Sequence, residues 1–421
     1  MASAAILGIG NELLLGQVTN TNAAWLAQRC SEVGFRVVHQ SVVGDSVPEI
    51  VQELRRLWER VELIVTTGGL GPTHDDVTVE ALAQFLGEEL QEHPTVREWL
   101  VEKARQRGQP SPERVLRQAL LPPSALPLPN PVGQAPGIWI ERDGKAVLAL
   151  PGVPAEMQAI VQTAAVDYLR RLRQRLGSGV TFRSINLVTA GIAEARLADL
   201  IGPPEDLLPD GVTLAFLPSF WGVRLRLDVY ADSPEMAEQR LEQARQRLQE
   251  RIQPYLLGEG EVHLSYVVGE ELRRRGETLA VAESCTGGLL GAAITDIPGS
   301  SDYFLGGHIA YSNAAKTTFL QVPPELLQSV GAVSQEVAEL LAENVRRAFG
   351  ATYGIGITGI AGPGGGTPQK PVGTVWIGLA TPERVSARRF VFGTDRAANR
   401  QRSVAAALTW LYRYLKGLPE E

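Results

Sequence analysis

A serine, a tyrosine and a lysine in the last third of the chain have the residue types that nucleophilic catalysis uses. Ser284 follows the apolar run 278–283 and precedes Thr286, Gly287 and Gly288 in the segment A-E-S-C-T-G-G-L-L. This order predicts a strand that ends at the serine and a helix that starts directly after it. Backbone N–H groups at such a helix start can stabilise a developing oxyanion or bind a phosphate. Ser284 is therefore the candidate nucleophile.

Lys316, in the segment G-G-H-I-A-Y-S-N-A-A-K, is the candidate general base. Arginine supplies nearly all of the 40 basic residues of the chain. The lysines are Lys103, Lys145, Lys316, Lys370 and Lys416. A buried lysine can lose its proton near neutral pH, whereas an arginine keeps its charge. A lysine at this position can therefore act as a base, which an arginine cannot. Tyr311 lies in the same segment.

Each of these residues also has an ordinary structural interpretation. Ser284 and Thr286 are suited to cap a helix. Lys316 alone is typical of a solvated side chain, and Tyr311 alone of a core aromatic with a wet tip. Their combination favours a catalytic site over these alternatives. Cys285 is a rival nucleophile, but as the neighbour of the serine at a strand end it should point away, into the core.

Two later segments are suited to bind a nucleotide beside this serine. The segment G-I-G-I-T-G-I-A-G-P-G-G-G predicts a strand that ends at Thr358 and opens into a loop with Gly362 and Gly364, where the backbone can approach a ligand closely. In F-G-T-D-R-A-A-N-R, Arg396 and Arg400 stand one helical turn apart at a helix start, as a fork for a phosphate. Together with the serine and the lysine, these segments indicate an amidase that acts on a nucleotide.

Glycines and carboxylates follow a buried strand near the N-terminus. The segment T-T-G-G-L-G-P-T-H-D-D places Gly68, Gly69 and Gly71 in a turn whose N–H groups can approach a phosphate. Its carboxylates, with one at an earlier strand end, are hard oxygen ligands for a divalent cation (Mg, Mn, Co or Ni) held against a pyrophosphate. The predicted metal ligands are Asp45, Asp75 and Asp76. Alternatively, the glycines form a tight turn and the aspartates cap a helix, and His74 is as well suited to the surface as to a metal.

The C-terminal segments together resemble the CinA C-terminal domain, the nicotinamide-nucleotide amidases that convert nicotinamide mononucleotide to nicotinate mononucleotide and ammonia. The resemblance covers residues 260–415. It implies a serine nucleophile with a lysine base, a proton and hydrogen-bond network, a substrate-holding arginine and no required cofactor. The implied residues are Ser284 as the nucleophile, Lys316 as the base, Tyr311 and Thr358 in the network, and Arg400 as the arginine that holds the substrate.

The N-terminal segments look like the molybdenum-cofactor-biosynthesis superfamily in its CinA form, over roughly residues 4–170. The likeness includes L-P-G-V-P-A-E-M and N-P-V-G-Q-A-P-G, in which Asn130 is a substrate-binding candidate. Relatives bind molybdopterin, whereas the CinA form is associated with metal-dependent cleavage of ADP-ribose to AMP and ribose 5-phosphate. We adopt the latter because an amidase domain is attached. Leu70 departs from relatives that often have threonine, which removes a hydroxyl near the expected phosphates.

The order of the predicted elements indicates an α/β protein with three domains. Strand 36–43, helix 48–60 and strand 63–67 show the alternation that is typical of a doubly wound parallel sheet. A small α+β unit follows, and another α/β unit begins after Pro254. The predicted domains are a molybdopterin-binding-like ADP-ribose pyrophosphatase domain at 1–170, a KH-like linker at 171–256 and the amidase domain at 257–421.

The middle domain resembles a KH-like fold without the G-x-x-G clamp for nucleic acid. We interpret it as a spacer or as an arm of the homodimer that we expect. Its segment F-L-P-S-F-W contains Phe216, Phe220 and Trp221, which form either a partner surface or, as we favour, a core hairpin.

Composition narrows the classes of partner. The net charge of −7 and the lack of a basic run argue against nucleic acid. Cys30 and Cys285 are too few and too far apart for a disulfide framework. The first residues do not resemble a signal peptide and no apolar run reaches the ~20 residues of a membrane span, so we expect a cytoplasmic protein whose partners are small nucleotides. The rival functions are a molybdopterin-type binding module and an accessory protein of DNA uptake or recombination, which the acidic charge disfavours.

Overall fold

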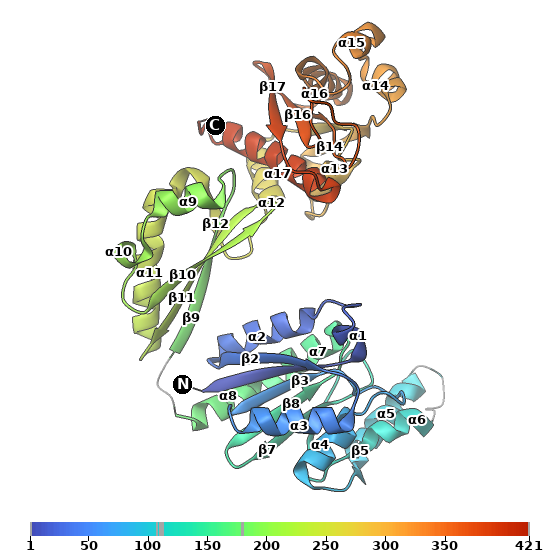
Figure 1. Ribbon diagram of the computed structural model, residues 1–421, viewed down its shortest axis with the longest axis vertical. Helices are drawn as coiled ribbons and strands as arrows, with labels where there is room; N and C mark the ends of the chain where they lie inside the picture. The colour runs from blue at the N-terminus through green and yellow to red at the C-terminus, as the bar shows by residue number, and fades with distance from the viewer. Residues whose placement is uncertain (1, 107, 109–112, 178–180, 420–421) are drawn as a thin grey trace. The chain divides into compact units, whose positions relative to one another are not determined.

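The computed structural model describes residues 2–106, 108, 113–177 and 181–419. These residues form two compact units, the first within residues 1–183 and 230–237 and the second within 184–229 and 238–421 (Figure 1). No helix in the described ranges is long and apolar enough to cross a membrane.

The first unit is built on a mixed sheet. Its strands in this sheet are β1 (Ser3–Ile9), β2 (Arg36–Val43), β3 (Leu63–Thr67), β6 (Leu126–Leu128), β7 (Gly137–Arg142) and β8 (Lys145–Leu150). Their order is β2-β1-β3-β8-β7-β6. The pairs from β2 to β8 are parallel, as the alternation of strands and helices predicts, whereas β7 and β6 pair in antiparallel fashion at one edge.

Helices and short elements complete the first unit. They are α1 (Asn11–Leu14), α2 (Thr21–Val33), α3 (Val47–Trp58), α4 (Thr78–Leu86), β4 (Gln91–Glu92), α5 (Pro94–Gln106), α6 (Glu113–Leu116), β5 (Leu120–Leu121), α7 (Pro154–Ile160) and α8 (Val166–Arg175). A π-helical turn, Val161–Ala165, joins α7 to α8.

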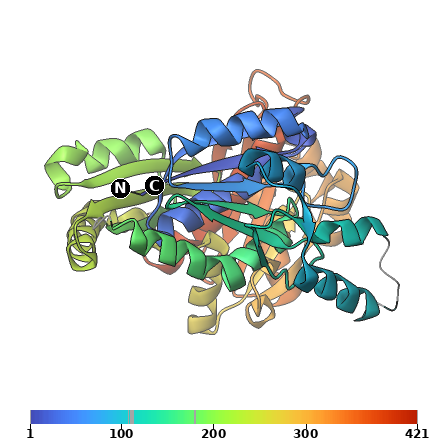
Figure 2. The same ribbon diagram turned by 90° about the horizontal axis from the view of Figure 1, so that it is seen from below.

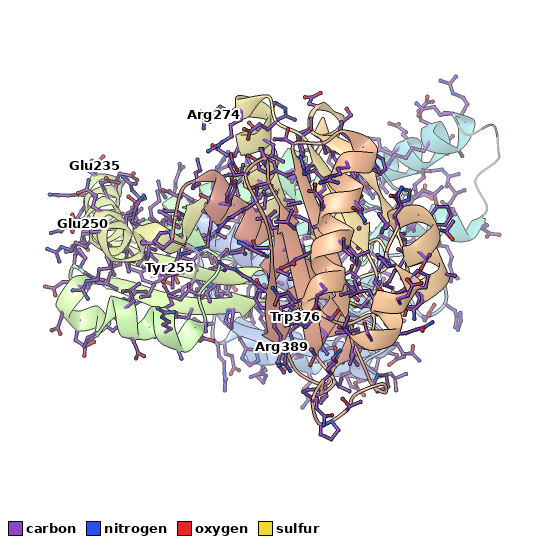
Figure 3. The ribbon with its side chains drawn as sticks, turned by 90° about the horizontal axis from the view of Figure 1, so that it is seen from above. Glu235, Glu250, Tyr255, Arg274, Trp376 and Arg389 are labelled. Atoms are coloured by element: carbon purple, nitrogen blue, oxygen red, sulfur yellow. The ribbon has the colours of Figure 1, made fainter. Side chains whose placement is uncertain are left out.

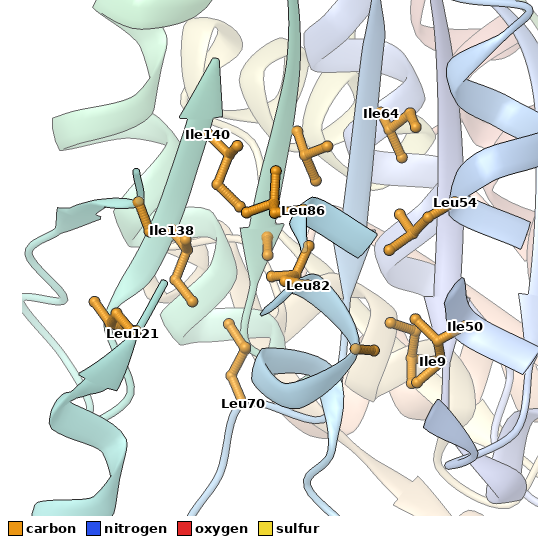
Figure 4. Close-up of a cluster of buried hydrophobic side chains, with 14 of the residues drawn as sticks. Ile9, Ile50, Leu54, Ile64, Leu70, Leu82, Leu86, Leu121, Ile138 and Ile140 are labelled. Carbon is orange, nitrogen blue, oxygen red and sulfur yellow. The ribbon is translucent and has the colours of Figure 1, made fainter. Parts of the chain in front are cut away.

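Both faces of this sheet are buried, which confirms the doubly wound fold. Successive residues of a strand point to opposite faces. Leu7 and Ile9 of β1 pack in the cluster formed with α3 and α4 (Figure 4), whereas Ala4 and Ile6 pack with α2, α7 and α8. Figure 2 shows α3 in blue and α7–α8 in green on opposite sides of the sheet. The carboxyl ends of β1 and β3 therefore open onto loops between two helical layers.

The middle part is an α+β arrangement, as predicted. Its strands are β9 (Thr181–Thr189), β10 (Val212–Ser219), β11 (Gly222–Ala231) and β12 (Leu256–Glu259), in the order β10-β11-β9-β12. Its helices are α9 (Glu194–Ile201), α10 (Pro204–Leu207) and α11 (Pro234–Ile252). In α11, Leu241, Ala244 and Leu248 are buried at the three- and four-residue spacing of one helix face.

The C-terminal part contains a second mixed sheet. Its strands are β13 (Leu279–Glu283), β14 (Phe304–Ile309), β15 (Tyr353–Gly359), β16 (Thr374–Ala380) and β17 (Val385–Val391). Its helices are α12 (Leu264–Arg275), α13 (Leu289–Thr295), α14 (Asn313–Leu320), α15 (Pro324–Ser329), α16 (Gln335–Phe349) and α17 (Arg396–Leu415). The order is β14-β13-β15-β16-β17, with β13 parallel to both neighbours and β16 and β17 antiparallel.

β13 is the buried centre of this part. Leu279 and Val281 pack in a cluster with α12, α13 and α17, and Ala280 and Ala282 pack in another with α14, α15 and α16. Because both faces are covered, the strand holds its carboxyl end rigidly. That end is where the sequence places the candidate nucleophile.

Candidate active sites

Ser284 at the end of β13 and Lys316 on α14 meet in a buried site. The backbone N–H of Ser284 donates to the carbonyl of Ile357 on β15 at 2.9 Å, which fixes the start of the loop. The side chain of Ser312 caps α14 by accepting from the Ala315 N–H at 3.1 Å, and Lys316 lies in the first turn behind this cap. Lys316 Nζ lies 3.0 Å from Ser284 Oγ, and the lysine is 1% exposed. The structure thus brings the predicted nucleophile and base together.

The contacts of Lys316 suit an uncharged amine. Its Nζ donates to the carbonyl oxygens of Ala310 at 2.8 Å and Tyr311 at 3.3 Å. A neutral amine that donates both N–H groups to these carbonyls has its lone pair left for the hydroxyl of Ser284. Burial lowers the pKa of Lys316 because desolvation disfavours the charged form, and Cys285 opposes this shift more weakly. The lowered pKa makes the neutral amine, which is the state that a general base needs, more accessible than it is for a lysine in water.

Cys285 points into the core, as predicted. It belongs to the hydrophobic cluster of the C-terminal part. Burial raises the pKa of its thiol to about 11. A thiol that stays protonated at neutral pH is a poor nucleophile, so the structure favours the serine over its neighbour.

Glu283, which the sequence analysis missed, holds the start of α13. It is buried, and its carboxylate accepts from the backbone N–H groups of Gly288 at 2.9 Å, Leu290 at 3.1 Å and Gly291 at 2.8 Å. The Gly287 N–H donates to the Ser284 carbonyl at 3.1 Å. The N–H groups of Gly287 and Gly288 thus already have acceptors within the protein, and their contact with a substrate stays a prediction.

Replacement of Glu283 by glutamine should loosen this loop. A glutamine keeps the shape but has one acceptor oxygen, so its amide N–H group would face backbone donors, at a cost of roughly 1–3 kcal/mol. We expect faster amide hydrogen exchange in the peptide that spans Gly288 and Leu290. Glu336→Gln, at an exposed first-turn glutamate of α16, is the matched control and should leave exchange unchanged. Equal exchange in Glu283→Gln and the parent would contradict the capping role.

Tyr311, Arg396 and Arg400 lie around the serine with partners of their own. The Tyr311 ring is exposed, and its hydroxyl accepts from Arg396 Nη2 at 2.8 Å. Arg396 Nη1 donates to the carbonyl of Gly362 at 2.8 Å, so this arginine joins the tyrosine to the glycine-rich loop. Arg400 Nη2 donates to the Thr286 carbonyl at 2.8 Å. Both arginines keep further N–H groups with which a phosphate could be bound.

Thr358 and Thr286 are both buried close to the nucleophile, but their hydroxyl groups differ in hydrogen bonding. Thr358 lies next to Ile357, the partner of the Ser284 N–H, but its hydroxyl donates to the carbonyl of Ala332 at 2.8 Å. Among the described residues, no hydrogen bond joins the Thr358 hydroxyl to Ser284 or Lys316, and its role in the proton network stays a prediction. The Thr286 hydroxyl is buried without a partner among the described residues, which leaves it for a substrate.

The glycine-rich loop is held in place by a second residue that the sequence did not reveal. Asn399 is fully buried, and its Nδ2 donates to the carbonyls of Ala361 at 3.0 Å and Gly393 at 2.8 Å. Gly362 has a φ of +94°, where a side chain would be strained. The space where a side chain of Gly364 would lie is open. The loop therefore has a fixed base and an open tip.

In the first unit, the predicted glycines and aspartates line one cavity of about 510 Å³. A Cβ on Gly68, whose φ is +115°, would lie 2.1 Å from the carbonyl oxygen of Ile9. Only glycine fits this contact between the ends of β3 and β1. The predicted residues on the cavity wall are Gly68, Gly69, Gly71, Asp45, Asp75 and Asp76, and the sequence analysis missed the carboxylates of Glu12 and Glu156.

Asn130 makes hydrogen bonds within the protein, and its predicted role in substrate binding stays a prediction. It is buried outside the lining of this cavity, and its Nδ2 donates to Glu156 Oε2 at 2.6 Å and to the Ala135 carbonyl at 2.8 Å. Its Oδ1 accepts from the N–H of Gly133 at 2.8 Å. Asn130 thus shapes the loop that carries Gly133 and orients Glu156. Leu70 lines the cavity and also belongs to the hydrophobic core, so its side chain is apolar where relatives often have a hydroxyl.

The carboxylates of this cavity are hard oxygen donors of the kind that can bind a divalent ion together with a phosphate. Asp45 Oδ2 accepts from the Asn11 N–H at 2.9 Å, and Asp76 Oδ2 accepts from the Thr73 N–H at 2.8 Å. A hydrogen bond from the Thr73 hydroxyl lowers the pKa of Asp75, which keeps it ionised. Among the described residues, no three His, Cys, Asp or Glu side chains are close enough to hold a metal by themselves. An ion with few protein ligands is common where phosphate oxygens and water complete its shell.

Family models match this chain in three successive segments. A probable molybdopterin binding domain matches residues 5–171, and the KH domain of the damage-inducible protein CinA matches residues 184–258. The CinA C-terminal domain matches residues 261–415.

Curated proteins and solved structures give similar matches. The CinA-like protein of Salinibacter ruber is 45% identical over 406 residues, which cover 96% of this chain and 97% of that protein. The putative competence-damage inducible protein of Moorella thermoacetica is 43% identical over 408 residues, which cover 97% of each chain. A crystal structure of the protein CinA, of unknown function, from Thermoplasma acidophilum is 38% identical, covers 40% of this chain and 97% of that one, and has a TM-score of 0.37.

Proposed function

Because this chain belongs to the CinA family, we propose that its C-terminal site hydrolyses the carboxamide of nicotinamide mononucleotide. The observation that carries the proposal is the 3.0 Å contact between Lys316 Nζ and Ser284 Oγ in a buried site. A desolvated lysine with a lowered pKa beside a serine is a nucleophile with its base.

In the proposed reaction, Ser284 gives its proton to Lys316 while its oxygen forms a bond to the carboxamide carbon. The lysine returns this proton to the amide nitrogen, the C–N bond breaks and ammonia leaves. A water molecule then attacks the acyl carbon and gives its proton to the lysine, and the ester bond to Ser284 breaks as the serine regains a proton. The products are nicotinate mononucleotide and ammonia.

The loop after Ser284 can supply donors for the oxyanion of this reaction. The N–H groups of Gly287 and Gly288 already bind Ser284 and Glu283, so the amides of Cys285 and Thr286 are the proposed donors. Arg396 and Arg400 at the start of α17 are the proposed partners of the phosphate, since both lie by the loops that surround the serine.

The direct test is ammonia release from nicotinamide mononucleotide by the purified full chain, with nicotinate mononucleotide quantified in the same samples. The proposal expects the two products in equal amounts. A folded protein that releases no ammonia from this substrate would overturn it.

We propose that the cavity in the first unit hydrolyses ADP-ribose to AMP and ribose 5-phosphate. Its wall joins the glycine turn at Gly68 to the carboxylates of Asp45, Asp75 and Asp76, a set that suits a pyrophosphate with a divalent ion. The ion would neutralise phosphate charge and lower the pKa of a bound water. Water attack on one phosphorus breaks the P–O–P bond, and one phosphate leaves with each product.

The double variant Asp75→Asn/Asp76→Asn should lose ADP-ribose hydrolysis by roughly a hundredfold or more, because two anionic ligands of the ion are gone. Ammonia release from nicotinamide mononucleotide should be unchanged, since that reaction uses the second unit. Asp167→Asn, at an exposed aspartate of α8, is the control for the loss of a surface carboxylate outside the cavity. Metal-dependent cleavage at the parental rate in the double variant would contradict the assignment.

The match of residues 5–171 to a probable molybdopterin binding domain favours a second candidate function for this cavity, the binding of a pterin without turnover. Calorimetry with ADP-ribose and with a pterin separates the two. Pterin binding together with absent cleavage of ADP-ribose would favour the binding module.

A further inference from the structure

A cavity of about 610 Å³ lies between the KH-like and amidase parts of the second unit. We call it the junction cavity. One wall comes from the turn between β10 and β11 with Phe220 and Trp221, and the other from β17 and α17 with Arg388, Phe390, Arg402 and Trp410. Its volume lies in the range of pockets that hold small ligands. The proposed amidase and pyrophosphatase reactions do not use it.

The walls of the junction cavity offer flat aromatic surfaces and cations. Phe390 and Phe392 stack with ring centroids 5.7 Å apart and an interplanar angle of 12°. The guanidinium of Arg388 lies 4.5 Å from the centroid of the Trp410 ring, and that of Arg402 lies 5.7 Å from the Phe220 ring. Phe220 is 47% exposed, so the hairpin does not bury it as we favoured from the sequence. Arginines that rest on aromatic rings keep N–H groups at their edges for an anion.

The charges of the cavity favour an anion. Among the described residues of the lining, Arg388 and Arg402 are cations and the acidic residue is Glu194, which is exposed. Arg388 has a further interaction besides its contact with Trp410. Arg413 also lines the cavity, but its guanidinium donates to the carbonyls of Pro254 at 3.3 Å and Pro419 at 2.6 Å and so has a structural role. Aromatic faces next to arginines are the surfaces on which planar rings with phosphate groups bind.

The junction cavity is separate from the amidase site although α17 contributes to both. Arg400 donates to the Thr286 carbonyl beside the nucleophile, whereas Arg402 lines the junction cavity. Residues two positions apart on a helix point about 200° from each other, so these arginines lie on nearly opposite sides of α17. A ligand in the junction cavity would therefore not occupy the place of the amidase substrate.

We propose that the junction cavity is a second small-molecule site, which binds an aromatic anion of mononucleotide size. The planar ring stacks on the aromatic side chains of the cavity, and the phosphate pairs with Arg402. The proposal is independent of the activities proposed above, because it rests on a different set of residues.

The test follows the indole N–H signals of the full chain labelled with ¹⁵N-tryptophan, with AMP as the probe. The chain has seven tryptophans, of which Trp221 and Trp410 line the junction cavity. Trp410→Phe identifies the Trp410 signal by its absence. We expect AMP to shift the signals of both tryptophans in a saturable way, and adenosine or inorganic phosphate alone to do so at concentrations roughly tenfold or more higher.

Variants show whether the shift arises in the cavity itself. Arg402→Ala and Phe220→Ala should each raise the AMP concentration at half-maximal shift about tenfold, because each removes one charge-assisted or stacking contact. Arg389→Ala is the matched control, because its side chain lies beside Trp376 on the other face of β17 (Figure 3). Asp76→Asn should also keep the shift, which excludes an effect relayed from the cavity of the first unit. No shift at millimolar AMP, or a shift that Arg402→Ala and Phe220→Ala leave intact, would overturn the proposal.

Discussion

Replacement of Lys316 by methionine should lower the kcat of ammonia release from nicotinamide mononucleotide by roughly 10²- to 10⁴-fold, the usual contribution of a general base. Methionine fills a similar volume but offers no lone pair to the Ser284 hydroxyl. Lys316→Arg should be as inactive, since an arginine cannot lose its proton in a protein. Lys370→Met, at a half-buried lysine whose Nζ donates to the Val330 carbonyl, is the control for the loss of a lysine elsewhere in the same domain. Parental kcat in Lys316→Met would remove the lysine from the mechanism.

The pH profile gives the same assignment an independent readout. The lysine works as a base when it is neutral, and burial lowers its pKa from the ordinary value of 10.5. We therefore expect kcat/KM to rise with pH through this lowered pKa and to level off below 10.5.

The lowered pKa of Lys316 also determines how the free energy of unfolding changes with pH. Between the two pKa values the unfolded chain binds the proton that the folded chain has released, so unfolding becomes less favourable as pH rises there. Lys316→Met should lose this part of the pH dependence of stability.

The parallel strands at the centre of both sheets were predictable, whereas the antiparallel pairings were not. Apolar runs such as 63–67 and 279–283, set between amphipathic helices, predict buried parallel strands at positions that the structure confirms. The antiparallel pairing of β7 with β8 and of β16 with β15 has no such signature, because a strand covered on both faces has the same apolar composition in either direction. Pairing direction depends on how distant segments meet, which spacing along the chain does not encode.

Residue type identified the reactive groups of the site but not their supports. Ser284 and Lys316 were predictable because a serine at a strand end and a lysine in an arginine-rich chain are unusual. Glu283 was hidden as the last residue of an apolar strand, although an acid just before a glycine-rich helix start is a signal for capping. Asn399 holds Ala361 across a long sequence separation, and only the folded chain shows that contact.

Ser284→Ala should abolish nearly all ammonia release, with a fall of kcat of roughly 10⁴- to 10⁶-fold, because no covalent intermediate can form without the hydroxyl. The matched variant Cys285→Ala should keep kcat within a few-fold and lower stability by about 1 kcal/mol or more, since its buried side chain packs in the core and its pKa of about 11 keeps the thiol protonated. Trapping with hydroxylamine during turnover provides a direct readout, since an acyl-serine intermediate yields a hydroxamate in the parent and in Cys285→Ala but not in Ser284→Ala. The reverse pattern, with activity lost in Cys285→Ala and kept in Ser284→Ala, would show that the thiol is the nucleophile. The loop would then have to change conformation during catalysis to bring Cys285 out of the core.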